Sequence, residues 1–228
     1  MPVAIVTGAS RGLGLALSRA LARDGWRLVI DARGSEALAA AADELGRLTE
    51  VAAMNGDVAD AGHREALLEA AGDRVDLLVN NASVLGPSPQ PRLDRYPLEE
   101  LEHVYRVNSI APLALIQLVL PRLADGGCIV NVTSDAGVEP YPGWGGYGSA
   151  KAALEQLTDV LAAEHPELRV YAVDPGDMRT RMHQEAFPGE DISDRPPPEE
   201  SVPGLLALVH GTRPSGRYRA HDLAEVRA

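Results

Sequence analysis

The feature that most constrains this chain is its opening sequence of apolar run, glycine-rich turn and amphipathic pattern. Residues 3–6 read VAIV, residues 7–14 read TGASRGLG, and residues 15–25 read LALSRALARDG. A short apolar run bounded by turn residues indicates a buried strand, and apolar residues recurring every three or four positions indicate a helix. Glycine allows the tight turn between the two. The chain therefore begins with a strand–turn–helix unit.

The same unit recurs along most of the chain. Further strand patterns cover residues 27–32, 50–55, 75–81, 128–134 and 168–176, and helical patterns cover 35–48, 62–72, 97–123 and 147–165. Several of the strands are continuous apolar runs, as expected when both faces of a sheet are covered. We expect an α/β fold, a single Rossmann-like doubly wound parallel sheet of about seven strands with helices on both faces.

A single domain over residues 1–228 is predicted, because no linker or repeat beyond the strand–helix alternation interrupts the chain. Its length suits one domain with a large core. The stretch 178–203 is rich in proline and acidic residues, so we expect a loop or lid there. A short helix over 203–211 and a last strand over 216–220 follow.

Charge and cysteine content exclude several classes of protein. The net charge of −12 opposes binding of nucleic acid or an anionic membrane as a whole. The one cysteine, Cys128, permits no intrachain disulfide, which fits a reducing cytoplasm, and it opens an apolar run as a buried thiol would. No signal peptide, membrane span or metal-ligand spacing of histidines is recognisable. We expect a cytoplasmic protein without a metal.

The glycine-rich turn has a defined chemical use. Gly8, Gly12 and Gly14 would let the backbone approach a pyrophosphate, while the following helix offers free N–H groups and the positive end of its dipole. A tight strand-to-helix turn without a ligand is the alternative. The position of the turn at the start of an alternating chain favours nucleotide binding. It is not a P-loop, because no Gly-Lys-Ser/Thr follows.

Charged residues at the ends of the second and third strands bear on which nucleotide is bound. A carboxylate at the tip of the second strand usually bonds the ribose of NAD, whereas an arginine there favours the extra phosphate of NADP. Both are present, as Asp31 and Arg33, and Arg11 could reach the same phosphate. Asp57 could accept a hydrogen bond from an adenine amino group, or it could cap the following helix.

Tyr147 and Lys151 lie four residues apart in YGSAK, and therefore on one face of a helix. A nearby cation favours the phenolate, so Lys151 is predicted to lower the pKa of Tyr147 and allow proton exchange. Ser134 closes the fifth strand and could hold a carbonyl or alcohol oxygen. A surface Tyr–Lys pair is the alternative.

Asn108 is predicted to lie at a helix kink. It stands among apolar residues, and Pro112 removes the N–H group that would bond its carbonyl. A free carbonyl or amide would then face the site. Taken alone, a structural polar residue is the stronger interpretation of Asn108.

Six motifs occur in a familiar order: TGASRGLG at 7–14, NNAS at 80–83, Asn108, Ser134, YGSAK at 147–151 and PGDMRT at 175–180. This order resembles the short-chain dehydrogenase/reductase family, in its standard short branch, over about residues 3–180. The extended branch of that family spaces its glycines differently. The resemblance implies an NAD(P)-dependent enzyme that transfers a hydride between the nicotinamide and a carbonyl or secondary alcohol.

The resemblance also assigns roles to residues. Asn108, Ser134, Tyr147 and Lys151 would form the catalytic tetrad. Tyr147 would exchange the substrate proton, Ser134 would orient the reacting oxygen, Lys151 would bind the nicotinamide ribose, and Asn108 would hold a water that links Lys151 to solvent. The implied cofactor-binding residues are Gly8, Ser10, Arg11, Gly12, Leu13, Gly14, Arg33, Asp57, Val58, Asn80, Ala82, Tyr147, Lys151, Pro175, Gly176 and Thr180.

The coenzyme preference implied by the resemblance is NADP(H), with NAD(H) left open. The position of the discriminating aspartate of NAD users falls on Ala32, and Arg33 matches the phosphate-binding arginine of NADP users. Asp31 falls one position early and could oppose a phosphate. The leading hypothesis is a ketone or 3-oxoacyl-type reductase. An NAD-dependent alcohol dehydrogenase and a non-catalytic cofactor-binding regulator are the alternatives.

Two departures from the family pattern matter. Ser83 replaces the usual glycine of N-N-A-G and narrows the space beside the cofactor. The short C-terminus lacks the usual glycine-rich ending, which weakens the case for the usual tetramer. The resemblance still implies a dimer through the two long helices, at about 98–122 and 147–164, so we expect a homodimer or homotetramer. The partner is a small-molecule carbonyl or alcohol, expected to be partly apolar because the predicted pocket residues are Asp135, Ala136, Tyr141, Trp144, Met178, Met182 and Phe187.

Overall fold

The computed structural model describes residues 1–224, and the last four residues of the predicted domain, 225–228, lie outside that range. Seven strands form one sheet in the order β3-β2-β1-β4-β5-β6-β7, and every neighbouring pair is parallel. The predicted doubly wound α/β fold is therefore confirmed. The strands are β1 Val3–Val6, β2 Arg27–Ala32, β3 Val51–Asn55, β4 Val75–Asn80, β5 Leu123–Val132, β6 Arg169–Asp174 and β7 Gly216–Arg219.

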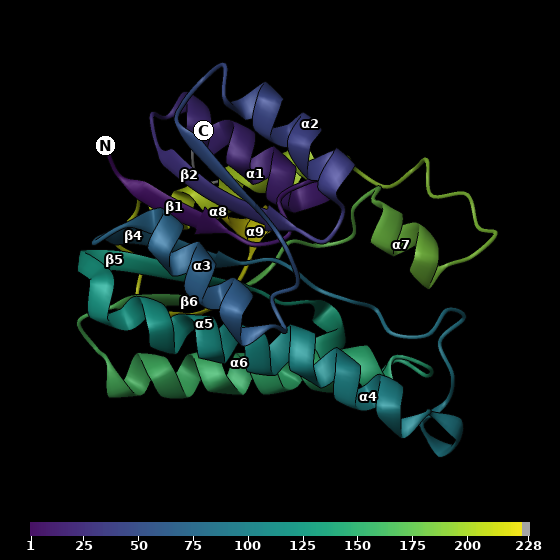
Figure 1. The fold of residues 1–228 in the computed structure, drawn as a ribbon. Coiled ribbons are helices and arrows are strands. Elements are labelled where there is room, and N and C mark those ends of the chain that lie inside the picture. Colours follow the sequence, from purple (N-terminus) through teal and green to yellow (C-terminus); the bar gives the residue numbers. More distant parts are fainter. Residues whose placement is uncertain (225–228) are drawn as a thin grey trace.

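Helices cover both faces of this sheet (Figure 1). One face packs against α1 Gly12–Arg23, α2 Ser35–Leu45 and α8 Val202–Val209. The other face packs against α3 Ala61–Ala71, α5 Ala111–Val119 and α6 Gly145–Glu164. The remaining helices are α4 Leu98–Tyr105, α7 Arg181–Ala186 and α9 Ala220–Ala224.

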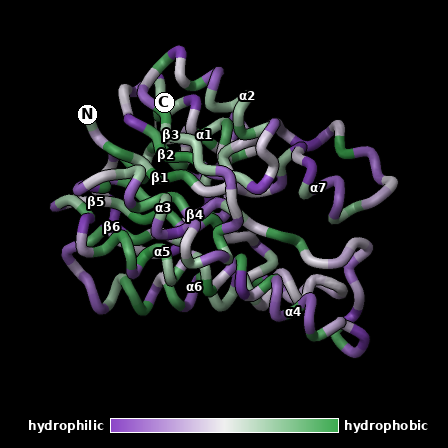
Figure 2. The backbone as a smooth tube through the Cα atoms, viewed as in Figure 1, coloured by the Kyte–Doolittle hydropathy of each residue, from purple (hydrophilic) through white to green (hydrophobic). Residues whose placement is uncertain are grey.

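The first strand shows why these strands read as unbroken apolar runs. Ala4 and Val6 belong to the core cluster on the α1 side, whereas Val3 and Ile5 belong to the cluster on the α5 side. Successive side chains of a strand point to opposite faces, so a strand covered on both faces needs apolar residues at every position. Figure 2 shows these central strands as mainly hydrophobic. Cys128 on β5 is buried in the same core.

The predicted long helix over 97–123 is interrupted in the structure. A π-helical turn, η2 Arg106–Ile110, separates α4 from α5 and contains Asn108. Pro112 follows in the first turn of α5, where its missing N–H group costs little. By length and composition the whole stretch Leu98–Arg122 could cross a membrane, but half of its most apolar part is buried inside the protein, as in the core helix of a globular domain.

The topology creates a crevice at one edge of the sheet. The strand order reverses between β1 and β4, and ligands of such sheets bind beyond the carboxyl ends of the strands at that point. Residues 178–203, which include α7, lie beside this edge (Figure 1). The Ser88 hydroxyl donates to the Glu185 carbonyl of α7 at 2.6 Å, so this segment is tied to the loop after β4.

Candidate active site

A cavity of about 860 Å³ opens at the carboxyl ends of the strands. Most of the predicted site residues line it: Gly8, Ser10, Arg11, Gly12, Leu13, Arg33, Asp57, Val58, Ala82, Ser134, Tyr147, Lys151, Pro175, Gly176 and Thr180. Gly14, Asn80 and Asn108 are not part of its wall. The fold thus brings together motifs that are spread over more than 170 residues of sequence.

The glycine turn is shaped by close packing against the end of β4. Gly8 has a φ of +67°, and a side chain there would come 2.9 Å from the Cα of Ala82. A side chain at Gly14 would overlap the Gly8 carbonyl and the Asn81 amide. The Asn81 side chain also donates to the Gly8 carbonyl at 3.2 Å. Glycine is therefore required at both positions for the turn to pack against the end of β4, and the turn leads into the N-terminus of α1 at the cavity wall.

Asn80 and Asp57 have different surroundings from those expected. The Asn80 amide is buried and donates to Asn131 Oδ1 at 2.8 Å, so this side chain joins β4 to β5. Asp57 lines the cavity while one of its oxygens accepts from the Ala59 amide at 2.9 Å. The cap of α3 is Asp60 instead, which accepts from the Gly62 amide. Among residues 1–224, the second oxygen of Asp57 has no hydrogen-bond partner.

The two charged residues at the end of β2 point in different directions. Asp31 is buried, with 1% of its surface exposed, and its Oδ1 accepts from the Gly8 amide at 2.6 Å. Its Oδ2 lies 3.0 Å from Nε2 of His63. The side chains of Arg33 and Arg11 are exposed at the cavity wall, and within residues 1–224 neither has a hydrogen-bond or ion-pair partner. Both oxygens of the Asp31 carboxylate therefore have partners, whereas the guanidinium groups of Arg33 and Arg11 have none among residues 1–224.

Ser134, Tyr147 and Lys151 meet at the inner end of the cavity. The Lys151 ammonium is buried, donates to the Val132 carbonyl at 2.8 Å and lies 5.5 Å from the centroid of the Tyr147 ring. The Ser134 hydroxyl donates to Asp135 Oδ1 at 2.9 Å. A phenol, a hydroxyl and an ammonium group therefore converge from α6 and from the segment after β5.

The electrostatics of Tyr147 differ from the sequence-based expectation. Burial raises the pKa of Tyr147 to about 12, and its hydrogen bonds with the Ser83 and Ser134 side chains offset only part of this rise. Burial also lowers the pKa of Lys151 to about 8, although the Glu155 carboxylate opposes that shift. The predicted lowering of the Tyr147 pKa by Lys151 is wrong for this structure, because burial of the phenol raises the pKa by more than the two serine hydrogen bonds lower it. The phenol carries its proton at neutral pH.

Asn108 lies in the π-helical turn behind the cavity. Its side chain is fully buried, with Oδ1 accepting from the Val84 amide at 2.9 Å and from the Ser83 hydroxyl at 3.1 Å. Its Nδ2 donates to the Val84 carbonyl at 2.8 Å. Asn108 thus fastens the segment after β4, and Ser83 connects it to the surroundings of Tyr147.

The family model for short chain dehydrogenases matches residues 2–191 of this chain. The chain belongs to that family. As a short-chain dehydrogenase it is an oxidoreductase enzyme with the expected fold and motif order. Sepiapterin reductase of Bos taurus is 32% identical over 197 residues, which cover 79% of this chain and 74% of that protein.

Two further relatives are similar over most of their length. The rhamnolipids biosynthesis 3-oxoacyl-[acyl-carrier-protein] reductase of Pseudomonas aeruginosa is 33% identical over 192 residues, 79% of this chain and 74% of that protein. The X-ray structure of an alcohol dehydrogenase from the archaeon Thermococcus sibiricus, complexed with 5-hydroxy-NADP, has a TM-score of 0.84 and 31% identity. The match covers 96% of this chain and 95% of that one.

This short-chain dehydrogenase also has a buried ionic network behind its catalytic pocket that the sequence analysis missed. Arg217 on β7 donates from Nε to Glu155 at 3.0 Å and from Nη2 to Asp174 at 3.3 Å. The Thr133 hydroxyl donates to the same Glu155 oxygen at 2.6 Å. Glu155 follows Lys151 by four residues on α6, so helical spacing alone places the two on one inward face.

The wall beside Tyr147 in this short-chain dehydrogenase is apolar and aromatic. Tyr147 packs in a cluster with Leu85, Trp144 and Met182, and the Trp144 and Tyr147 rings meet edge to face with centroids 5.8 Å apart. Tyr141 is exposed, and its hydroxyl donates to Asp135 Oδ2 at 3.0 Å. Of the other predicted pocket residues, Met178 lines the cavity, Ala136 packs beside Tyr147, and the Phe187 ring contacts Trp144 at an interplanar angle of 47°.

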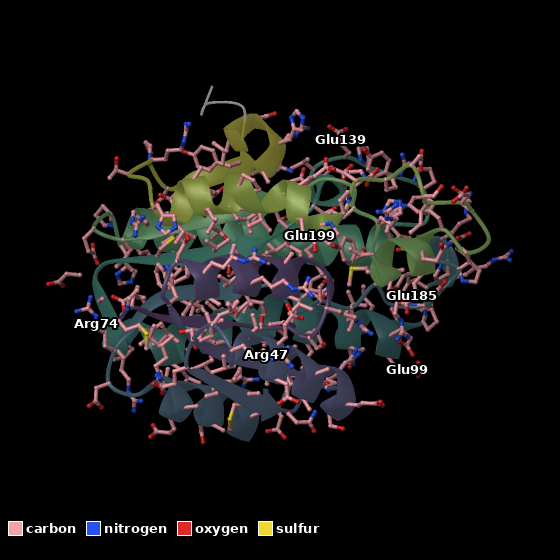
Figure 3. All side chains as sticks on the ribbon, turned by 90° about the horizontal axis from the view of Figure 1, so that it is seen from above. Arg47, Arg74, Glu99, Glu139, Glu185 and Glu199 are labelled. Carbon is pink, nitrogen blue, oxygen red and sulfur yellow. The ribbon has the colours of Figure 1, made fainter. Side chains whose placement is uncertain are left out.

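Acidic side chains surround the outer end of the enzyme near α7. Figure 3 shows Glu99, Glu139 and Glu185 at that end, with Arg74 at the opposite end. Beside them Arg179 and Arg181 line the cavity. Arg181 donates to Glu185 at 2.6 Å, so its charge is already paired with a carboxylate.

Proposed function

We propose that this short-chain dehydrogenase is an NADP(H)-dependent reductase of apolar ketones or 3-oxoacyl-type carbonyls. The observation that carries the coenzyme choice is the pair of available guanidinium groups of Arg33 and Arg11, beside an Asp31 carboxylate that is already occupied. The NADP-type ligand of the similar archaeal alcohol dehydrogenase supports this choice. The reductase activities named for the two curated relatives support the direction.

The glycine-rich turn and the donor groups around the cavity suit a dinucleotide. Amides at the start of α1 would bond the pyrophosphate, Asp57 and Val58 would meet the adenine, and the two arginines would hold the 2′-phosphate. Lys151 and Tyr147 would meet the nicotinamide ribose, with Pro175, Gly176 and Thr180 at the nicotinamide itself. When bound, the reduced coenzyme supplies the hydride.

The chemistry proposed for the protein is proton transfer to the carbonyl oxygen of the substrate. The Tyr147 phenol, protonated at neutral pH, donates the proton. The Ser134 hydroxyl, which donates to Asp135 in the structure, turns its proton to the same oxygen when the substrate is bound. Lys151, held by the Val132 carbonyl, places a positive charge beside the phenolate that forms. Asn108 positions the segment beside the nicotinamide site through its bonds to Val84.

The remaining sequence-based expectations belong to the same proposal. Residues 1–228 would form one coenzyme-binding domain, with 178–203 as a lid over the substrate. The aromatic wall around Trp144 suits a carbonyl that carries an apolar or aryl group. We further propose a cytoplasmic homo-oligomer.

The proposed activity is tested by following NADPH oxidation with three probes: an aryl ketone, an aliphatic ketone and a 3-oxoacyl thioester. We expect turnover with at least one probe, and much weaker turnover with NADH. Faster oxidation of secondary alcohols with NAD⁺ than reduction of any probe with NADPH would replace the reductase assignment with the alcohol dehydrogenase alternative.

Replacing Arg33 with alanine is expected to weaken NADPH binding by about 10- to 100-fold and leave NADH binding within twofold, because a charge-assisted bond to the 2′-phosphate is lost. Dissociation constants follow from the fluorescence of the bound nicotinamide. Arg47, an exposed residue after α2 that is not part of the cavity wall, is the matched control. If R33A binds NADPH with unchanged affinity, Arg33 does not contact the 2′-phosphate.

The pH dependence of kcat/KM for NADPH should follow the loss of the proton from Lys151. Burial lowers its pKa to about 8, so the ammonium form is present below that pH and is lost above it. We therefore expect kcat/KM for NADPH to be level near pH 7 and to fall about tenfold per pH unit well above 8. The K151R variant keeps its charge and should lack this descent. A profile for K151R that matches the wild type would assign the descent to another group.

A further inference from the structure

We propose that His63 is a specificity-determining residue for the coenzyme, because it holds the Asp31 carboxylate away from the wall where the 2′ position of the ribose would lie. The proposal rests on the coenzyme site described above. It concerns a side chain that neither the motif order nor the catalytic geometry involves.

Asp31 stands where a carboxylate would decide between the two coenzymes. It is the last residue but one of β2, two positions before Arg33, and it lines the cavity. A carboxylate at this edge can accept from a ribose 2′-hydroxyl and repel a 2′-phosphate. In the structure both of its oxygens are engaged inward instead, one by the Gly8 amide at 2.6 Å and one by His63 at 3.0 Å.

His63 reaches Asp31 from α3, which is a different part of the chain. It lies in the first turn of α3, with 8% of its side chain exposed, against 2% for Asp31. A methyl group at Gly56 would overlap the His63 ring at three of its atoms. Residue 56 must therefore be glycine for the imidazole to reach Asp31, so three separate positions combine to make this contact.

The consequence is electrostatic. With Oδ1 bonded to Gly8 and Oδ2 bonded to His63, both carboxylate oxygens are engaged, and the exposed Arg33 guanidinium is the charge that is free to meet a ligand. Without His63, Oδ2 loses its partner in a buried place, which favours rotation toward the cavity and its water. A carboxylate there would repel a phosphate and offer a bond to a free 2′-hydroxyl.

The test is the ratio of the dissociation constants for NADH and NADPH in His63→Leu. The inference predicts that this ratio falls at least tenfold from its wild-type value, through weaker NADPH and tighter NADH binding. The wild-type ratio alone tests the proposed coenzyme, whereas the change between wild type and variant tests this inference. The proposed coenzyme preference and the proposed role of His63 can therefore be disproved independently.

Two further variants keep the result interpretable. Adding Asp31→Asn to H63L should restore the ratio to within about threefold of wild type, because an asparagine oxygen still accepts from Gly8 but carries no charge. Gly56→Ala keeps both His63 and Asp31, yet it should shift the ratio in the same direction by displacing the ring. It also serves if H63L does not fold.

The matched control is His165→Leu, which removes a histidine 3.2 Å from Glu167 on the surface and should leave the ratio unchanged. The proposal is overturned if the ratio of the NADH and NADPH dissociation constants in H63L stays within twofold of wild type. If H63L does not fold, the same criterion applies to G56A. A fall in the ratio that Asp31→Asn does not reverse would also overturn the proposal, because the shift would then not come from the carboxylate.

Discussion

Replacing Tyr147 with phenylalanine is expected to lower kcat for carbonyl reduction by about 10³-fold. The ring keeps its place against Trp144 and Leu85, so the change removes only the hydroxyl group. A positioned general acid contributes on the order of 10²- to 10⁴-fold. With its pKa raised to about 12, the Tyr147 phenol is fully protonated at pH 7 and serves as that acid.

The measurement is the single-turnover rate of NADPH oxidation with a probe ketone. NADPH affinity and the thermal midpoint should stay close to wild type, which separates lost chemistry from lost binding. Tyr141→Phe is the matched control, because that phenol is 44% exposed and bonds only to Asp135. We expect Y141F to lower the single-turnover rate by less than tenfold. Unchanged turnover in Y147F would sink the assignment of Tyr147 as the proton donor.

Replacing Arg217 with methionine is expected to lower the free energy of unfolding by about 2–3 kcal/mol. The change leaves the buried Glu155 carboxylate without its arginine partner, and it leaves Asp174 with only the more distant Arg219, at 3.9 Å. Breaking a fully buried pair costs roughly 3–5 kcal/mol, and we reduce that figure because Arg217 is 24% exposed and partly screened by water. For a chain of this length the thermal midpoint should fall by roughly 5–10 °C.

The midpoint is measured by circular dichroism without coenzyme. Arg74→Met is the control, since Arg74 pairs with Asp76 on the surface and is 70% exposed. The double variant that combines Glu155→Gln with R217M should lose less unfolding free energy than the sum of the losses in the two single variants, because the two residues belong to one network. A midpoint for R217M no lower than that for R74M would mean that the network contributes little to stability.

Much of the fold and the outline of the site could be predicted because they depend on local pattern. Continuous apolar strands such as residues 3–6 require covered faces, and the strand–helix alternation then requires a parallel sheet. Parallel strands share one carboxyl edge, so the glycine turn, Ser134 and the Tyr147–Lys151 pair had to meet there. The π-helical turn at Asn108 follows a local signal too, the proline four residues later.

The features that sequence did not reveal depend on contacts between distant residues. Asp31 and His63 are 32 residues apart, and no pattern indicates that the carboxylate turns inward. Arg217 and Glu155 are 62 residues apart and meet only because β7 completes the sheet beside α6. The pKa of Tyr147 depends on how deeply the phenol is buried, which the spacing to Lys151 does not express.

The most direct test of the central claim, a carbonyl reductase that uses NADPH, is a paired titration of the wild-type protein with NADPH and NADH, followed by nicotinamide fluorescence. The account predicts saturable binding of both, with NADPH bound at least tenfold more tightly. Tighter binding of NADH would contradict the coenzyme assignment and favour alcohol oxidation. Binding of neither coenzyme would contradict the assignment of the cavity itself.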